Sequence, residues 1–213
     1  FETFFNHWEQ DTNHINKPIL EWIEGEMKIP LYWDLDIYIK ESEGDEQLCI
    51  FRETLYKFIN EKMSYLFNLT DYSSFVSNFY ITKNMREVIQ RGGKINKVSY
   101  HVIYRDKING IYSKGTKQQN LFNKYFIKWI EEQDNSNEFI INGEHIIDGG
   151  VYSKGQALRI LESVKEVSYK PVLGSAMWLD SGLGIQDKRD FFLQCPYDYK
   201  CELEIPPCWE TDK

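Results

Sequence analysis

The chain has 213 residues, of which 42% are hydrophobic and 15% aromatic, enough for one domain or two closely joined lobes. We find no apolar run long enough to span a membrane and no secretory leader, so we expect an intracellular protein with no membrane partner. The net charge of −8 argues at long range against binding to a phosphate backbone. The start at Phe1 and the charged end predict a fragment of a longer protein.

Residues 1–28 are rich in aromatic side chains and predict an N-terminal helical segment. Residues 29–39 form a β-branched and aromatic run that is typical of a buried strand, and Asp34 and Asp36 lie within it. Side chains two apart on a strand share a face, so the two carboxylates point together and repel each other. A divalent cation such as Mg²⁺ or Mn²⁺ would neutralise them. The alternative is that this Asp-x-Asp caps a loop or faces solvent.

Several acids between residues 41 and 46 predict a loop, and residues 49–67 have apolar positions at helical spacing. Strands are predicted at residues 74–82 and 97–104, joined through a turn at Gly92-Gly93. On the second strand Lys97, Ser99 and His101 share one face, and all three side chains can donate to phosphate oxygens. The alternative is an amphipathic edge strand whose polar face is solvated.

Asn109-Gly110 predicts a hairpin turn, and residues 121–130 predict an amphipathic helix. Residues 139–143 and 146–148 predict a strand pair that ends at Asp148, a single acid that means little alone. Arg159 and Lys165 follow. The apolar spacing in residues 153–166 fits a helix.

Residues 176–213 contain three prolines and several acids, and we expect a C-terminal extension of the same domain that leads toward a missing downstream region. Cys195, Cys201 and Cys208 lie in this stretch at spacings that match no zinc pattern. Free thiols are therefore expected.

Three segments, taken in order, resemble the catalytic domain of the archaeo-eukaryotic primase superfamily. Asp34-Leu35-Asp36 matches its acidic first motif, Lys97-Val98-Ser99-Tyr100-His101 its Ser-x-His motif preceded by Lys, and Asp148 its third motif, followed by Val151-Tyr152-Ser153 and Arg159. Primase-polymerases and the primase halves of large-DNA-virus primase-helicases are the most similar branches. The resemblance covers residues 29–170 and favours a strand over a helix within residues 153–166.

The resemblance implies an α/β (α+β) fold with an RRM-like catalytic sheet, helices packed on it and a second α/β lobe, the catalytic domain being residues 29–175. It implies a DNA-dependent nucleotidyltransferase, a primase or primer-extending polymerase of DNA replication. Asp34, Asp36 and Asp148 would hold two Mg²⁺ or Mn²⁺ ions about 4 Å apart. The incoming nucleoside triphosphate would be bound by Lys97, Ser99, His101, Arg159 and Lys165, with His101 protonated against phosphate. The implied partners are a single-stranded DNA template, a primer strand and a helicase domain on the same polypeptide.

The chain departs from this family at Gln156-Ala157, where primase-polymerases usually carry an Arg-Asn pair. Either this chain binds phosphate more weakly or other residues contribute to the binding. Candidates upstream are Lys83, Arg86 and Arg91. The window from residue 83 to 117 holds nine basic side chains against two acidic ones, a net charge of +7, and leaves −15 for the rest of the chain. Such a patch is an electrostatic footprint for nucleic acid, although surface solubility also explains part of it.

Two other classes of function remain open from the sequence. A metal-dependent nuclease also places acids on strands, but the row of Lys97, Ser99 and His101 fits a triphosphate better. A rolling-circle initiator nuclease would need paired histidines, and no second His stands two residues after His101. A non-catalytic module that binds single-stranded DNA would retain three acids that destabilise the fold without a chemical use.

Overall fold

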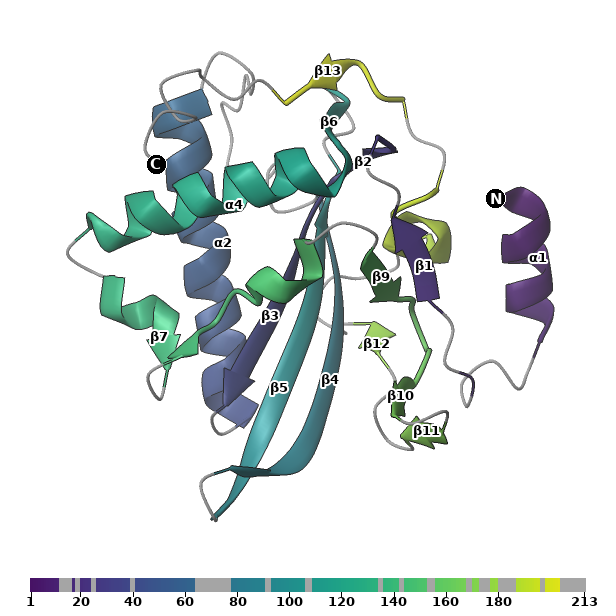
Figure 1. Ribbon diagram of the computed structural model, residues 1–213, viewed down its shortest axis with the longest axis horizontal. Helices are drawn as coiled ribbons and strands as arrows, with labels where there is room; N and C mark the ends of the chain where they lie inside the picture. The colour runs from purple at the N-terminus through teal and green to yellow at the C-terminus, as the bar shows by residue number, and fades with distance from the viewer. Residues whose placement is uncertain are drawn as a thin grey trace.

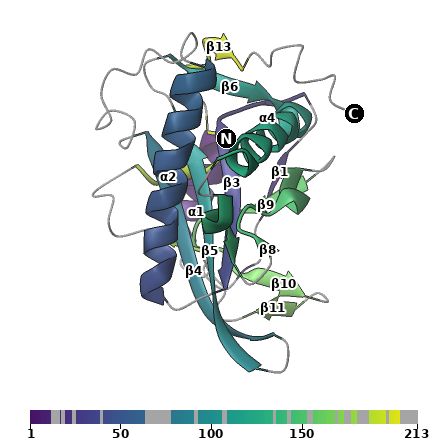
Figure 2. The same cartoon turned by 90° about the vertical axis from the view of Figure 1, so that its left-hand side faces the viewer.

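The chain was analysed as a computed structural model, drawn in Figures 1 and 2. It describes residues 1–11, 17, 20–23, 26–38, 41–63, 78–90, 93–105, 109–133, 136–141, 144–152, 156–167, 170–172, 177–179, 187–195 and 198–203. Within these ranges three α-helices combine with several sheets, so the predicted mixed α+β class is confirmed at that level.

The helices are α1 (Glu2–Gln10), α2 (Glu41–Met63) and α4 (Gly115–Glu131), with 3-10 turns η2 (Ser136–Phe139), η3 (Gly149–Tyr152) and η5 (Lys188–Phe191). The strands are β1 (Leu20–Ile23), β2 (Lys28–Ile29), β3 (Leu31–Tyr38), β4 (Phe79–Gln90), β5 (Gly93–Tyr104), β6 (Ile111–Lys114), β7 (Ile140–Ile141), β8 (Glu144–His145), β9 (Gln156–Arg159), β10 (Lys165–Val167), β11 (Lys170–Val172), β12 (Trp178–Leu179) and β13 (Cys201–Glu202).

The central sheet has four antiparallel strands in the order β12-β4-β5-β3. β4 and β5 pair along their whole lengths, and β3 pairs with the second half of β5, from Leu31 opposite Tyr104 to Tyr38 opposite Lys97. The far end of the β4–β5 hairpin therefore extends beyond β3, as Figure 1 shows. The strands predicted at residues 29–39 and 97–104 are confirmed as β3 and β5.

One face of the central sheet is apolar and carries the helices. Trp33 of β3 contacts Phe51 of α2 and Phe122 of α4, with ring centroids 5.6 and 6.1 Å apart. Figure 2 shows α2 running along this face, with β1 and β9 on the other side of the sheet. A Cβ atom at Gly44 would lie 3.2 Å from Tyr100 Oη, so the small residue lets α2 approach the sheet closely. The predicted helix at residues 121–130 is confirmed, as is the described part of the one at 49–67.

The acidic stretch at residues 41–46, predicted as a loop, is instead the beginning of α2. Carboxylates are favourable in the first turns of a helix, because its N-terminus carries a partial positive charge. Asp45 also accepts hydrogen bonds from Lys83 Nζ at 2.7 Å and from Tyr100 Oη at 2.6 Å. Asp45 therefore joins α2 to the sheet.

Among the described residues of the N-terminal segment, α1 is the helical part, and its Trp8 and Phe5 pack against Phe192 near the C-terminus. Instead of a further helix, residues 20–23 form β1, which pairs antiparallel with β9. β9 confirms the strand that was favoured within residues 153–166.

The hairpin predicted at Asn109-Gly110 is wrong, because β6 pairs with β2 and β13 and not with β5. Gly110 has a φ of +60°, and a Cβ atom there would lie 2.1 Å from the carbonyl oxygen of Asp198. The backbone N–H of Lys200 donates to the Gly110 carbonyl at 2.9 Å. This glycine is therefore required where the C-terminal segment docks.

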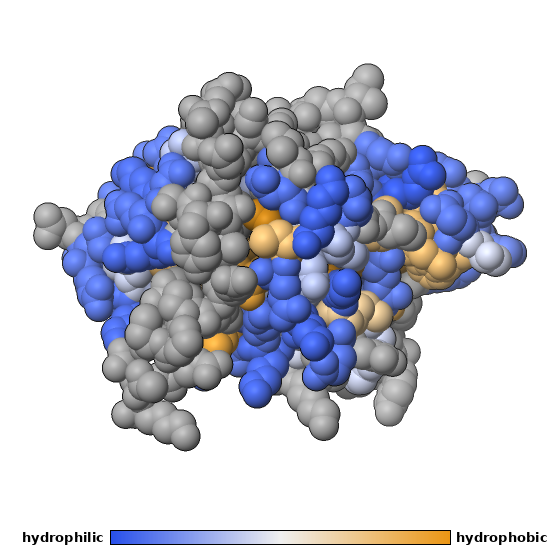
Figure 3. Space-filling view, turned by 90° about the horizontal axis from the view of Figure 1, so that it is seen from above, coloured by the Kyte–Doolittle hydropathy of each residue, from blue (hydrophilic) through white to orange (hydrophobic). Residues whose placement is uncertain are grey.

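Hydrophilic residues cover much of the described surface, and hydrophobic residues show in separate patches (Figure 3). The most exposed large apolar side chains are Ile89, 81% exposed, and Trp22, 56% exposed. In the described part of the chain no helix has both the length and the apolar character needed to cross a membrane. Cys49, Cys195 and Cys201 are free thiols, as expected, and Cys208 lies outside the described residues.

Candidate active site

The face of the central sheet opposite the helices is polar, because alternate residues of three neighbouring strands point to it. The antiparallel register sets these side chains in three rows across β3, β5 and β4: Asp34, His101 and Thr82; Asp36, Ser99 and Asn84; Tyr38, Lys97 and Arg86. The predicted shared faces of the two acids and of the Lys-Ser-His row are thus confirmed. The register adds that each acid stands directly opposite a member of that row.

The third acid reaches this face by pairing with β3. Ile147 forms an antiparallel bridge with Leu35, and the N–H of Asp148 donates to the Asp34 carbonyl at 2.9 Å. The N–H of Asp36 donates in turn to the Ile146 carbonyl at 2.8 Å. The first strand of the predicted pair is β7, but its partner is β8 (Glu144–His145) and not residues 146–148. Residues 146–148 instead run beside β3, which places Asp148 next to Asp34.

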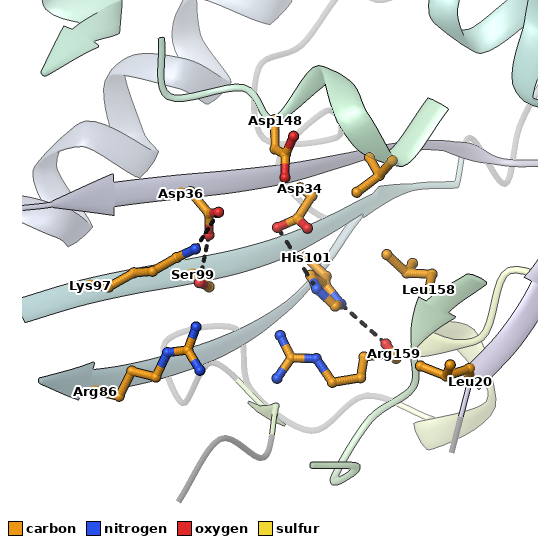
Figure 4. A pocket seen from close by; sticks show the side chains of 11 residues that line it. Leu20, Asp34, Asp36, Arg86, Lys97, Ser99, His101, Asp148, Leu158 and Arg159 are labelled. Atoms are coloured by element: carbon orange, nitrogen blue, oxygen red, sulfur yellow. Dashed lines mark hydrogen bonds and ion pairs between the residues drawn. The ribbon is translucent and has the colours of Figure 1, made fainter. Parts of the chain in front are cut away.

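A second wall stands over the polar face and is built from β1 and β9. Leu20 pairs with Arg159 in this two-stranded sheet, and the Arg159 carbonyl lies 3.2 Å from His101 Nδ1. The two walls enclose a pocket of about 310 Å³ (Figure 4). The residues that line it include the three predicted acids and most of the predicted phosphate ligands. The full lining is Leu20, Asp34, Asp36, Arg86, Lys97, Ser99, His101, Asp148, Val151, Leu158 and Arg159.

Asp36 is held by the two side chains nearest to it. Lys97 Nζ donates to Asp36 Oδ2, and Ser99 Oγ donates to Oδ1 at 2.6 Å. Burial acts to lower the pKa of Lys97, but the hydrogen bond and charge of Asp36 outweigh it and raise the pKa above its ordinary value. Lys97 is therefore an ammonium ion that neutralises Asp36. Phosphate binding is not its sole role.

The negative charge of Asp34 is less well neutralised than that of Asp36. Burial, followed by the charges of Asp36 and Asp148, raises the pKa of Asp34 to about 7, against the opposing attraction of Arg159 and Lys97. Its Oδ1 atom is buried without a hydrogen-bond partner, and His101 Nε2, at 3.8 Å, is too distant to provide one. A buried carboxylate oxygen in this position is destabilising unless a cation or a proton meets it.

His101 is buried and electrically neutral in the free protein. Burial, and then the charge of Arg159, lower its pKa to about 3. A carbonyl oxygen can only accept, so we assign the ring proton to Nδ1, which faces the Arg159 carbonyl. Nε2 then presents a lone pair toward Asp34. The protonated form was predicted only with phosphate bound, and that state stays a prediction.

The acids suit a hard divalent cation, although the site is not assembled around one. Within the described residues no three His, Cys, Asp or Glu side chains already form a group that could hold a metal ion. At Asp36 the Lys97 ammonium already pairs with the carboxylate. The unpartnered Asp34 oxygen, with Asp148 and Asp36 beside it, nevertheless provides the oxygen donors that Mg²⁺ and Mn²⁺ prefer.

Three residues named from the sequence remain. Lys165, predicted to bind the nucleotide, begins β10, but its side chain lies outside the described part of the structure, so this assignment stays a prediction. Tyr152 is 1% exposed, and its hydroxyl donates to the Tyr32 carbonyl at 3.2 Å, so it belongs to the core under η3. Arg86 was named only as a reserve cation, yet it lines the pocket. The period-two pattern of β4 could have placed it there, had the register with β5 been known.

Comparison of the chain with protein-family models and with curated protein sequences found no match.

Proposed function

We propose that this chain is a DNA-dependent nucleotidyltransferase with an archaeo-eukaryotic primase fold, a primase or primer-extending polymerase that acts in DNA replication. One observation carries the proposal. Asp34, Asp36 and Asp148 line a single pocket together with the phosphate-binding candidates Lys97, Ser99, His101 and Arg159, although these residues come from three separate motifs.

The three acids would hold divalent ions, Mg²⁺ or Mn²⁺, which when bound activate an attacking hydroxyl and stabilise the charge on a pyrophosphate leaving group. The protein's contribution is to keep the carboxylates close together, with Asp34 and Asp36 on β3 and Asp148 in the segment that pairs with it. Ser99 fixes the orientation of Asp36 through its hydrogen bond at 2.6 Å. Asp148 is oriented by its own loop, since the Gly150 N–H donates to Asp148 Oδ1 at 2.8 Å.

Lys97 changes partner in this scheme. In the free protein it neutralises Asp36. With Asp36 bound to a cation instead, the Lys97 ammonium would be available to donate to a phosphate oxygen of the incoming nucleotide. His101 would follow a similar course, because an approaching phosphate raises the pKa of the imidazole, and only the protonated ring donates from Nε2.

The cations of the pocket favour nucleotidyl transfer over the nuclease alternative. Arg86, Lys97 and Arg159 come from three different strands and surround the same space as the acids. A nuclease needs the metals but has no need of so many donors for a polyphosphate group. A triphosphate substrate uses both sets of side chains.

Incubation with a circular single-stranded template, labelled nucleotides and Mg²⁺ or Mn²⁺, with and without a primer, tests the proposal. We expect wild-type protein to incorporate label and the Asp36→Ala variant to fall to background. Glu87→Gln is the matched control, because Glu87 is exposed on β4 of the same sheet and pairs with Lys94 outside the pocket. Incorporation by Asp36→Ala at the wild-type rate would remove the assignment of the acids. Shortened template without incorporation would identify a nuclease instead.

A further inference from the structure

Arg86 has a position that the three motifs do not account for. It stands on β4 directly opposite Lys97 of β5, so both side chains point to the polar face. Its Nε atom is buried and has no hydrogen-bond partner within the described structure. Figure 4 shows its guanidinium at the side of the pocket below Asp36 and Lys97, facing the guanidinium of Arg159.

Two guanidinium groups that face each other in a half-buried pocket repel. Burial lowers the pKa of Arg159 most; the charge of Asp34 opposes this, and the charge of Arg86 lowers the pKa further. An anion with several negatively charged oxygens between the two arginines would remove this repulsion and satisfy the unpartnered Arg86 Nε–H. The guanidinium is suited to such a ligand because its donors form a rigid fork that matches phosphate oxygens.

The pocket is also polarised along its length. Leu20, Leu158 and Val151 line it with apolar surface, and Figure 4 shows Leu20 and Leu158 at the end away from Arg86 and Lys97. The apolar end suits the sugar and base of a nucleotide, and the opposite end suits its charged tail. Arg159 lies between the two ends.

We propose that Arg86 and Arg159 form a clamp for the terminal phosphates of a nucleoside triphosphate, with the nucleoside lying toward Leu20 and Leu158. This inference rests on the proposed function and assigns one subsite of it. The family that this chain resembles usually has an arginine where the chain has Gln156-Ala157. Arg86 would supply a guanidinium to the clamp from β4 instead.

Binding of inorganic tripolyphosphate in the presence of Mg²⁺, measured by calorimetry, tests the clamp separately from catalysis. Loss of a charge-assisted hydrogen-bonding partner predicts that Arg86→Ala weakens binding about tenfold or more. Arg86→Lys keeps the charge but loses the fork, so it should bind with intermediate affinity. Lys94→Ala is the control, because Lys94 is exposed on the same hairpin and does not line the pocket. It should bind as the wild type does.

A second measurement compares ATP with AMP. The wild type should prefer ATP, and Arg86→Ala should lose most of that preference while its affinity for AMP stays unchanged. Thermal melts of each variant establish that it is folded before binding is measured. Tripolyphosphate binding that is absent in the wild type, or equal in wild type and Arg86→Ala, would overturn the clamp. Arg86-dependent binding in a protein that incorporates no nucleotide would support the clamp and reject the polymerase function, so the two failures are distinguishable.

Discussion

Glu21 gives a prediction that links stability to the wall of the pocket. This carboxylate is 6% exposed and accepts two backbone hydrogen bonds, from Leu193 N–H at 2.8 Å and Gln194 N–H at 2.9 Å. It lies on β1 between Leu20 and Trp22, and β1 supports β9, which carries Arg159. Glu21 therefore anchors the second wall of the candidate site to the C-terminal segment.

Burial raises the pKa of Glu21 from 4.5 to about 7, although the two N–H donors and Arg105 favour the charged form. The unfolded chain releases this proton near pH 4.5 and the folded chain near pH 7. Between these values the folded state binds more protons, so its stability falls as the pH rises. The difference corresponds to about 3 kcal/mol, which is present in full below pH 4.5 and lost by pH 8.

Urea unfolding of wild type and Glu21→Gln between pH 4.5 and pH 8 measures this contribution. Glutamine does not titrate, so the stability of the variant should change by about 3 kcal/mol less than that of the wild type over this range. The variant also loses one acceptor for the 193–194 backbone, which shifts its curve by a constant amount at every pH. Asp34 titrates in both proteins, and its effect cancels in the difference.

Glu9→Gln, an exposed carboxylate on α1, is the control and should run parallel to the wild type. If the free energies of unfolding of Glu21→Gln and wild type also run parallel from pH 4.5 to pH 8, the raised pKa of Glu21 is wrong. The backbone hydrogen bonds would then outweigh its burial.

Three further predictions concern the pocket and its surroundings. Asp34→Asn should raise the melting temperature in metal-free buffer at pH 8, because it removes a buried negative charge beside other carboxylates. In a thermal-shift assay, Mn²⁺ should stabilise the wild type but not the variant. His101→Ala should weaken binding of a labelled nucleotide far more than binding of single-stranded DNA, since His101 faces the pocket; equal losses would assign it to the template. Replacement of Lys107, Lys114 and Lys117 by Glu should make the affinity for single-stranded DNA less dependent on salt concentration. On a log–log plot the slope should fall by roughly 0.7 for each lost phosphate contact. An unchanged slope would mean that the template binds elsewhere.

The sequence predicted the elements whose side-chain pattern is complete within one segment. Alternation in β3 and β5 identified both strands and the shared faces of their polar residues, because the period of a strand is two wherever it pairs. The apolar stripe of α4 was equally readable, since Phe122 and Phe126 follow the period of a helix that packs on a core.

Features that depend on pairing between distant segments were missed. Asp36 meets Ser99 and Lys97 only because β3 and β5 pair in this register, and nothing local to either strand fixes it. The Gly110 turn looked like a hairpin because Asn-Gly is a local signal, whereas its positive φ serves contact with the backbone near Asp198. The role of Arg86 required knowledge of two strands and of the β1–β9 wall at once.

Two unsatisfied atoms summarise the electrostatic character of the pocket and limit what can occupy it. Asp34 Oδ1 is a buried acceptor without a donor, and Arg86 Nε is a buried donor without an acceptor, in a pocket where Lys97 already neutralises Asp36. A metal ion alone would satisfy the first atom but would itself be repelled by Arg86 and Arg159. A phosphate alone would satisfy the second atom but would itself be repelled by the acids. A polyphosphate bound together with divalent cations would satisfy both atoms, so the charges of this pocket favour that combination over either ion by itself.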